Sequence, residues 1–263
     1  MNIRKVSAGN GVQWITESVQ LILKNPAPFA LMGLVMAVLG VIPVLGSLAL
    51  AVASPALYGG IAWAAREQSR GSSAQFDHLA QAFKEPGKIG PMLLLCLPGV
   101  IASLIIGVLL VVVLTVMLAG VGVSAATDSG TALLGALGAG GMLLLLVLLA
   151  LMMAVVVMTF FAIPDVMFRH NDAFTAMKLS VRASIDNIGA VLVYLLVLFV
   201  IVMIVVMVMS VVSSLLAQLL VPIVLAPVFG ASTWLAWKEI YGDVTAELPP
   251  VPPQAPDDGG MVA

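Results

Sequence analysis

The stretch from Asn25 to Ala65 reads NPAPFALMGLVMAVLGVIPVLGSLALAVASPALYGGIAWAA, and none of its 41 residues is charged. A single helix of that length would extend about 60 Å, twice the roughly 30 Å hydrocarbon thickness of a bilayer. Its central segment IPVLGS contains Pro43 and Gly46, which disfavour a continuing helix and suit a turn. The pattern therefore predicts a hairpin of two membrane-spanning helices, near residues 27–42 and 47–65.

Three further uncharged runs cover residues 89–127, 129–164 and 187–237. Each is longer than the roughly 18 apolar residues that indicate a membrane span. Single spans are predicted near 90–118 and 141–164. The last run needs two spans, near 188–209 and 220–238. The sequence thus predicts an all-α integral membrane protein, with six transmembrane helices arranged as three hairpins in a membrane domain covering residues 1–245.

The composition agrees with a membrane protein, since 62% of the 263 residues are hydrophobic, 9% are charged and the mean hydropathy is +1.17. Soluble domains carry roughly a quarter charged residues. The net charge of −2 argues against a nucleic-acid partner. Residues 246–263, with the segment PPVPPQAPDDGG, are predicted to form a disordered, acidic tail.

Basic residues indicate the orientation, because they favour cytoplasmic loops. With six spans and a cytoplasmic N-terminus, all 11 lysines and arginines, Lys88 included, fall on the cytoplasmic side. The opposite loops, near Pro43, Asp128 and Ser214, contain none. Both termini are therefore predicted to be cytoplasmic.

An amphipathic stretch precedes each predicted hairpin, as expected of helices on the inner membrane surface. Its apolar positions are Val12, Ile15, Val19, Ile22 and Leu23 in the first, Phe76, Leu79, Ala80 and Phe83 in the second, and Phe174, Met177, Val181 and Ile185 in the third. Ser18 and Asn25 in the first unit match Ser180 and Asn187 in the third. We interpret this as three repeated units of surface helix plus hairpin. The alternative is that small hairpins look alike without a repeat.

Ionisable residues offer few candidates for chemistry, because none lies in the middle of a predicted span. Asp165 follows Pro164 at a cytoplasmic boundary, where capping or an ion pair with Arg169 is favoured over a proton relay. His78 and His170 do not have the spacing of metal ligands. We therefore predict no catalytic, metal or cofactor site, and no enzymatic activity.

Methionines and glycines form two further patterns that could indicate sites. Met203 and Met207 lie four residues apart, as a soft cation would require, but packing or lipid contact is the simpler interpretation. Glycines from Gly135 to Gly141 lack the context of a phosphate loop and are interpreted as a turn or a close helix contact. Gly107 and the pair Gly59 and Gly60 are expected to permit close helix packing.

Two pairs of residues remain as candidate functional positions. Lys178 and Arg182 lie four apart on the polar face of the third surface helix and are predicted to contact lipid headgroups, with a solvated face as the alternative. Pro55 and Pro227 are possible helix-break positions, at equal distances before Arg66 and Lys238.

Four segments carry a resemblance to known proteins: QWITESVQLILKNP at 13–26, IPVLGSLALAVASPALYGG at 42–60, FFAIPDVMFRHNDAFTAMKLSVRASIDN at 160–187, and WKEIYGD at 237–243. Through them the chain resembles a family of uncharacterised multi-pass inner-membrane proteins of proteobacteria. The resemblance implies a bacterial inner-membrane location and cytoplasmic surface helices. It supplies no activity and no functional residues.

We therefore expect a non-enzymatic inner-membrane component that organises membrane lipids or partner proteins. The alternative is a small transporter or channel without intramembrane ion-coupling residues, motivated by Pro55 and Pro227. A membrane enzyme ranks third, because no clustered polar site is found.

Overall fold

The computed structural model describes residues 3–124, 130–169 and 171–242, and in these ranges it contains helices and no strands. The predicted all-α class is therefore confirmed. The predicted tail, the loop around Asp128, and His170 lie outside the described residues. The helices are α1 (Asn10–Leu23), α2 (Pro26–Val41), α3 (Leu45–Ser69), η1 (Phe76–Ala80), α4 (Gln81–Lys84), α5 (Ile89–Leu94), α6 (Leu97–Ser124), α7 (Gly130–Thr159), α8 (Ala162–Arg169), α9 (Ala173–Asp186), α10 (Ile188–Val212) and α11 (Ser214–Tyr241).

Helices occupy each of the six segments in which a span was predicted. Among the described residues, five helical stretches are long and apolar enough to cross a membrane: α3, α5 with α6, α7 with α8, α10, and α11. With 16 residues, α2 is too short to qualify alone. If α1 and α2, which are bent by 109° relative to each other, are counted as one span, the number of candidate spans is six.

The reversal between α2 and α3 lies where it was predicted, since α2 ends at Val41 and α3 begins at Leu45. The backbone N–H of Leu45 donates to the carbonyl of Pro43 at 2.6 Å, and Val44 between them has a φ of 60°. This is a tight γ-turn, a strained geometry for a β-branched residue. A Cβ atom on Gly46 would lie 1.8 Å from the Leu39 carbonyl oxygen, so the turn requires glycine.

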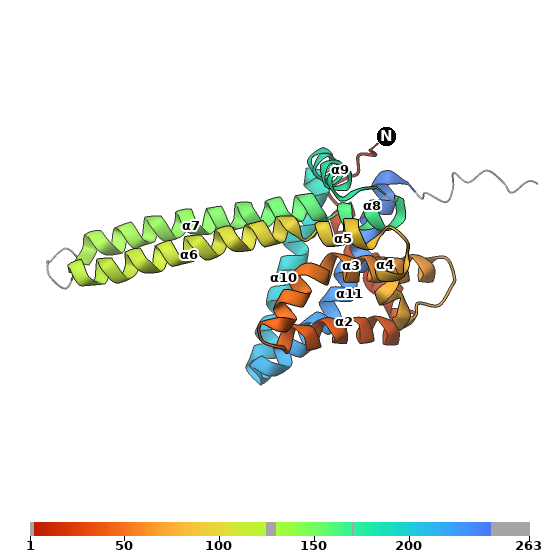
Figure 1. Cartoon of the computed structure of the whole chain (residues 1–263), viewed down its shortest axis with the longest axis horizontal. Helices are drawn as coiled ribbons and strands as arrows, with labels where there is room; N and C mark the ends of the chain where they lie inside the picture. The colour runs from red at the N-terminus through yellow and green to blue at the C-terminus, as the bar shows by residue number, and fades with distance from the viewer. Residues whose placement is uncertain (1–2, 125–129, 170, 243–263) are drawn as a thin grey trace, which may run out of the picture.

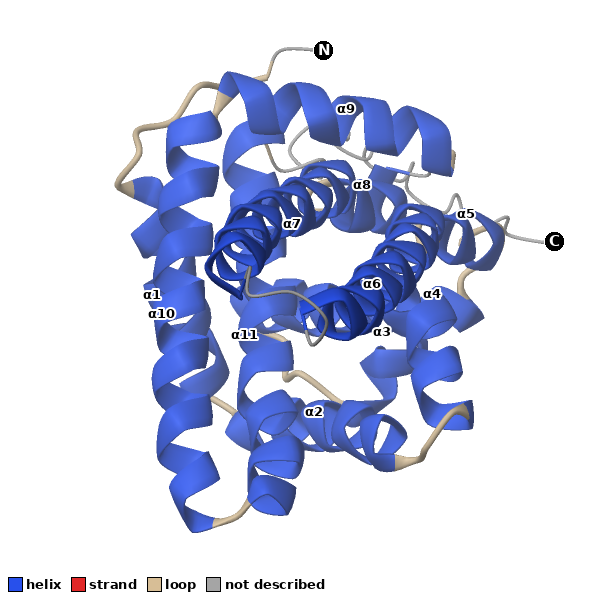
Figure 2. Cartoon of the chain, turned by 90° about the vertical axis from the view of Figure 1, so that its left-hand side faces the viewer, coloured by secondary structure: helices blue, strands red, loops and turns tan. Residues whose placement is uncertain are grey.

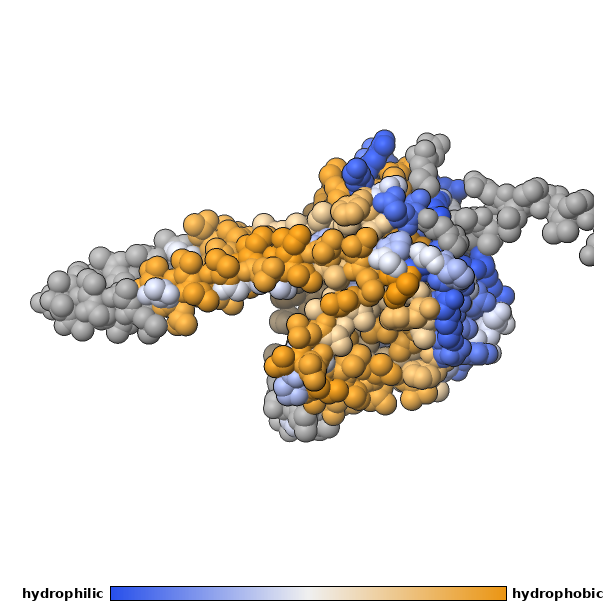
Figure 3. Space-filling model, viewed as in Figure 1, coloured by the Kyte–Doolittle hydropathy of each residue, from blue (hydrophilic) through white to orange (hydrophobic). Residues whose placement is uncertain are grey.

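Helices α6 and α7 form a long hairpin that projects from a body built from the other helices (Figure 1). Viewed from its tip, the hairpin stands in front of that body (Figure 2). Hydrophobic residues cover the hairpin and most of the body, and hydrophilic residues gather at the end opposite the hairpin tip (Figure 3). An apolar flank with one polar end is the surface expected of a protein embedded in lipid.

The glycine series was wrongly interpreted as a turn, because α7 already begins at Gly130 and contains it. Alanines and leucines alternate with these glycines, which sustains a helix, and α7 packs against α6. A Cβ on Gly107, Gly138, Gly140 or Gly141 would meet nothing within 4 Å. The predicted close helix contact at Gly107 is therefore absent within the described chain.

Close packing occurs instead at glycines of the body. A Cβ on Gly33 of α2 would lie 2.6 Å from the Ile223 Cα of α11, and one on Gly230 of α11 would lie 2.6 Å from Ile61 of α3. A Cβ on Gly60 would lie 2.3 Å from the Leu79 carbonyl oxygen, so this predicted contact is confirmed. The first and last hairpins thus meet almost backbone to backbone.

The three surface segments do not pack mainly on their own hairpins. Helix α1 packs on α10 and α11, the segment η1–α4 packs on α3, and α9 packs on α7 and α8. The three units are α1–α3, η1–α8 and α9–α11. Each surface segment packs on the hairpin of a different unit: α1 on that of the third, η1–α4 on that of the first, and α9 on that of the second.

An asparagine at the corner before the first and the third hairpin ties its unit to the next segment of another unit. The Asn25 amide donates to the Ala74 carbonyl at 3.2 Å, ahead of η1. The Asn187 side chain accepts from the Val6 N–H at 2.8 Å, ahead of α1. At the second corner, Lys88 instead donates to the carbonyls of Val166 and Met167 in α8, which belongs to its own unit. The two asparagine ties therefore support a match between the first and third units.

Helix α1 buries a face other than the apolar face that was predicted to lie on the membrane surface. Trp14, Ser18 and Leu21 are buried, whereas Val12, Val19 and Leu23 are exposed, and only Ile15 belongs to both the predicted and the buried face. Trp14 is buried because its indole N–H donates to Glu239 at 2.5 Å and its ring lies 6.2 Å from that of Tyr194. Helix α1 therefore has two apolar faces, one inward and one outward.

Candidate functional site

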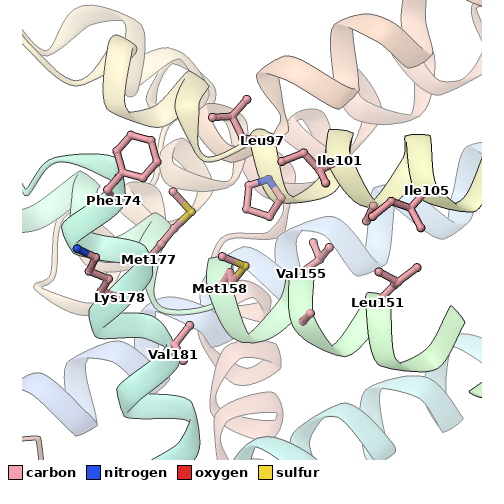
Figure 4. A pocket seen from close by; sticks show the side chains of 13 residues that line it. Leu97, Ile101, Ile105, Leu151, Val155, Met158, Phe174, Met177, Lys178 and Val181 are labelled. Atoms are coloured by element: carbon pink, nitrogen blue, oxygen red, sulfur yellow. The ribbon is translucent and has the colours of Figure 1, made fainter. Parts of the chain in front are cut away.

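An apolar groove of about 460 Å³ lies where α9 crosses the base of the α6–α7 hairpin. Figure 4 shows its lining side chains, contributed by these three helices. The lining residues are Leu97, Pro98, Ile101, Ala102, Ile105, Leu151, Ala154, Val155, Met158, Phe174, Met177, Lys178 and Val181. Twelve of the thirteen are apolar, and the exception is Lys178, at the α9 side of the groove.

Ser180 fixes α9 against the hairpin. Its hydroxyl donates to the Val157 carbonyl at 2.7 Å and accepts from the Phe161 N–H at 3.1 Å. These groups flank the break between α7 and α8, where backbone groups lose helical partners. The Tyr241 hydroxyl donates to the Leu179 carbonyl at 2.9 Å and anchors the same part of α9 from α11. These hydrogen bonds therefore hold α9, which forms one wall of the groove, against the rest of the protein.

The start of α9 is fixed by Asp172, whose carboxylate accepts from the N–H groups of Phe174 and Thr175, each at 3.0 Å. Hydrogen bonding from Thr175 holds the pKa of Asp172 below its usual value. An ionised N-cap is also favoured by the helix dipole. Because of this cap, Phe174 is placed at the rim of the groove, where it is exposed.

Three of the four apolar residues predicted on one face of α9 line the groove, and the fourth lies on the surface. Phe174, Met177 and Val181 line the groove, and Ile185 is exposed beyond it. Of the two predicted headgroup contacts, Lys178 lines the groove and Arg182 does not. The Arg182 side chain is 74% exposed and lies 4.0 Å from Asp186, so it adds positive charge to the outer surface of α9.

A buried polar cluster lies beside the groove, at the junction of α8 and α11. Asp165 accepts hydrogen bonds from Asn171 at 2.6 Å and from the Trp237 indole at 3.2 Å. The predicted ion pair is present, with Arg169 at 3.9 Å from Asp165. Arg169 also donates to the Tyr241 carbonyl at 2.9 Å. Every member of this cluster contacts protein, so its role is to join helices.

Three tryptophans of α3 and α11 each lie beside a cation. Arg66 lies 4.4 Å from the ring centre of Trp63, Lys238 lies 5.2 Å from that of Trp234, and Arg169 lies 5.1 Å from that of Trp237. Such cation–π pairs suit the boundary between lipid and water, where one end of the ring is apolar and the other polar.

Lys88 has a contact that the sequence interpretation missed. It was predicted only to fall on the cytoplasmic side, and it is 2% exposed and donates to the carbonyls of Val166 and Met167, each at 2.7 Å. These carbonyls end α8 and lack helical partners. Burial lowers the pKa of Lys88 to about 8. No local pattern points to this contact, because the acceptors are 78 and 79 residues away.

The remaining candidates are dispersed. His78 accepts from the N–H of Gln75, the residue that precedes η1, and burial lowers the pKa of His78. Met203 and Met207 are exposed on α10. Pro55 and Pro227 lie inside α3 and α11, which continue on both sides of them. In the described part of the chain, no three His, Cys, Asp or Glu side chains are grouped so that they could hold a metal ion.

These features define an all-helical protein with several long apolar helices that are able to cross a membrane. The chain belongs to the family described as a domain of unknown function, DUF7847, whose model matches residues 12–248. Neither a curated protein nor a solved structure matches the chain.

Proposed function

We propose that this protein is a non-enzymatic, multi-pass protein of a bacterial inner membrane that holds and organises phospholipid. In this proposal the groove at α9 takes one acyl chain, and the Lys178 ammonium contacts the phosphate of the same lipid. Arg182, farther along the exposed surface of α9, adds attraction for anionic headgroups.

The observation that carries this proposal is the composition of the groove, which is apolar throughout and is bordered on α9 by Lys178, whose aliphatic part lines the groove and whose ammonium group points out of it (Figure 4). A phospholipid presents the same combination, because a charged phosphate is joined to a long apolar chain. A lysine at the edge of apolar surface attracts anionic lipid with roughly 1 kcal/mol per charge. Phe174 and Val181 provide apolar contact on the side of the groove next to that charge.

The orientation forms part of the same proposal. The polar end of the molecule faces the cytoplasm, with both termini on that side, because lysines and arginines are retained there. Helix α9 then lies at the inner leaflet, and α2 completes a set of six crossing helices. This placement puts the groove at the depth where headgroups meet acyl chains.

Lipid retained by the purified full-length protein tests the proposal. Native mass spectrometry after exchange into mixed micelles of phosphatidylglycerol and phosphatidylcholine counts the bound lipids. We expect phosphatidylglycerol to be retained in preference, and Lys178→Glu to lower its occupancy by about fivefold or more. Lys178→Arg should restore it. Ala154→Leu, which fills the groove, should lower the occupancy of both lipids.

Lys84→Glu is the matched control, because Lys84 is an exposed lysine on another surface, paired with Asp77. It changes the net charge equally and should leave lipid retention unchanged. If Lys178→Glu and Lys84→Glu reduce retention equally, or if Ala154→Leu has no effect, the groove is not a lipid site and the proposal is wrong.

A further inference from the structure

A second cavity, of about 360 Å³, lies within the apolar body, between α2 and α3 on one side and α10 and α11 on the other. It is separate from the groove at α9 and shares no lining residue with it. The lining residues are Met36, Gly40, Leu50, Tyr58, Leu198, Val202, Pro222, Leu225, Ala226 and Phe229.

The cavity interrupts packing that is otherwise close. Beside it, Gly33 brings α2 almost onto the backbone of α11, and Gly230 brings α11 onto Ile61 of α3. The same helices separate around Ala226 and Leu50. A volume of this size is within the range of small-molecule sites and far exceeds the space that one water molecule needs.

Among the described residues that line the cavity, Tyr58 is the one with a hydroxyl, amide or charged side chain. Its ring is held edge-on against Phe229, with 4.9 Å between ring centres. In the described part of the chain its hydroxyl makes no hydrogen bond, whereas the hydroxyls of Tyr194 and Tyr241 bond to Ser232 at 2.7 Å and to Leu179 at 2.9 Å. An unpaired hydroxyl in an apolar medium is costly, so a bound group that pairs with it gains affinity.

We infer that this cavity is a binding site for a small, largely apolar molecule with one hydrogen-bond acceptor, such as a carbonyl, which accepts from the Tyr58 hydroxyl. The apolar lining accommodates the hydrocarbon part, and the Tyr58 O–H orients the polar group. Gly40 is exposed at the outer edge of the cavity, so entry occurs from the lipid phase. This inference is independent of the lipid groove, because the two sites share no residue.

Benzophenone is a suitable probe, because it is apolar, has one carbonyl acceptor, and inserts into nearby C–H bonds on irradiation. The full-length protein in liposomes is irradiated with benzophenone, and the modified residues are mapped by mass spectrometry. We expect saturable labelling concentrated on cavity residues such as Met36, Leu198 and Leu225. Tyr58→Phe should reduce this labelling about fivefold, which corresponds to the loss of one hydrogen bond.

Further variants distinguish a probe bound in the cavity from a probe dissolved in the surrounding lipid. Ala226→Leu, or Gly40→Leu at the exposed edge, should reduce cavity labelling by occupying the space. Tyr194→Phe, which removes a hydroxyl outside the cavity, and Ala154→Leu, which fills the other groove, should leave it unchanged. Labelling spread evenly over the lipid-facing helices, or cavity labelling that Tyr58→Phe does not reduce, would mean that lipid chains fill this space and would overturn the inference.

Discussion

The Lys88 ammonium group donates a hydrogen bond of 2.7 Å to the carbonyl oxygen of Met167, in the last turn of α8. A second bond of the same length reaches Val166, so one buried cation satisfies two carbonyls at a helix end. A positive charge there also complements the negative end of the helix dipole. Because Lys88 begins the second hairpin and α8 ends it, this contact closes the hairpin at its base.

Replacement of Lys88 by methionine should destabilise the protein by about 1–3 kcal/mol, because two buried carbonyls lose their donor. Thermal unfolding in detergent measures the loss. The control is Lys84→Met, which removes an exposed lysine paired with Asp77 and should cost less than about 1 kcal/mol. Equal effects of the two changes would show that the cap at α8 contributes no stability.

Lys88 should also make stability depend on pH. Burial lowers its pKa from 10.5 to about 8, so between these values the unfolded chain binds a proton that the folded protein has released. The free energy of unfolding of the wild type should therefore rise from pH 8 to pH 10.5 relative to Lys88→Met, by on the order of 3 kcal/mol. Unfolding curves of both proteins across this range test the sign, and a constant or falling difference would contradict it.

Asp165 is expected to tolerate little change, because it is 1% exposed and three side chains converge on it. Asp165→Ala leaves the Trp237 and Asn171 donors without their acceptor and Arg169 without its ion-pair partner. We therefore expect the free energy of unfolding to fall by about 3–5 kcal/mol. Asp165→Asn should cost less, because an amide oxygen still accepts one bond. Asp186→Ala, which removes a partner of the exposed Arg182, should change stability by at most about 1 kcal/mol. A small loss in Asp165→Ala would show that the cluster is not needed.

Two glycines within helices provide a matched test of the packing. Gly33→Ala places a Cβ 2.6 Å from the α11 backbone and should cost about 1–3 kcal/mol, because neither helix can move without separating the hairpins. Gly107→Ala meets nothing within 4 Å and should be neutral or slightly stabilising. Denaturation in detergent gives both values. Similar values for the two variants would mean that α2 and α11 are not in close contact.

Orientation can be measured with single cysteines after Cys96→Ala removes the native thiol. We expect a membrane-impermeant thiol reagent to label Ser129→Cys in intact cells, because the predicted loop faces away from the cytoplasm. Ser73→Cys should react only after the cells are opened. The reverse pattern would invert the proposed topology, and labelling of both positions in intact cells would remove the span between them.

Features that depend on neighbouring residues could be predicted from the sequence, whereas contacts between distant segments could not. Charged residues are costly in lipid wherever they occur, so charge-free runs locate the helices, and Pro43 and Gly46 locate a turn through local backbone geometry. Lys178 could be assigned to one face of α9 because helical spacing determines a face, and its predicted contact with headgroups stays a prediction. Lys88 was missed because its acceptors are close only after distant segments pack. The inward face of α1 was not predicted for a similar reason, since Glu239, which accepts the hydrogen bond of Trp14, lies 225 residues further along the chain.

The exchange of surface helices has a consequence for biosynthesis. Helix α1 is synthesised before α10 and α11, on which it packs. Until α10 and α11 have been made, Trp14 must therefore contact something other than its final neighbours, and the bilayer surface is the nearest apolar environment. A chain that stops before Glu239 would lack the acceptor of the Trp14 indole N–H, so α1 reaches its final packing only after α11 has been made.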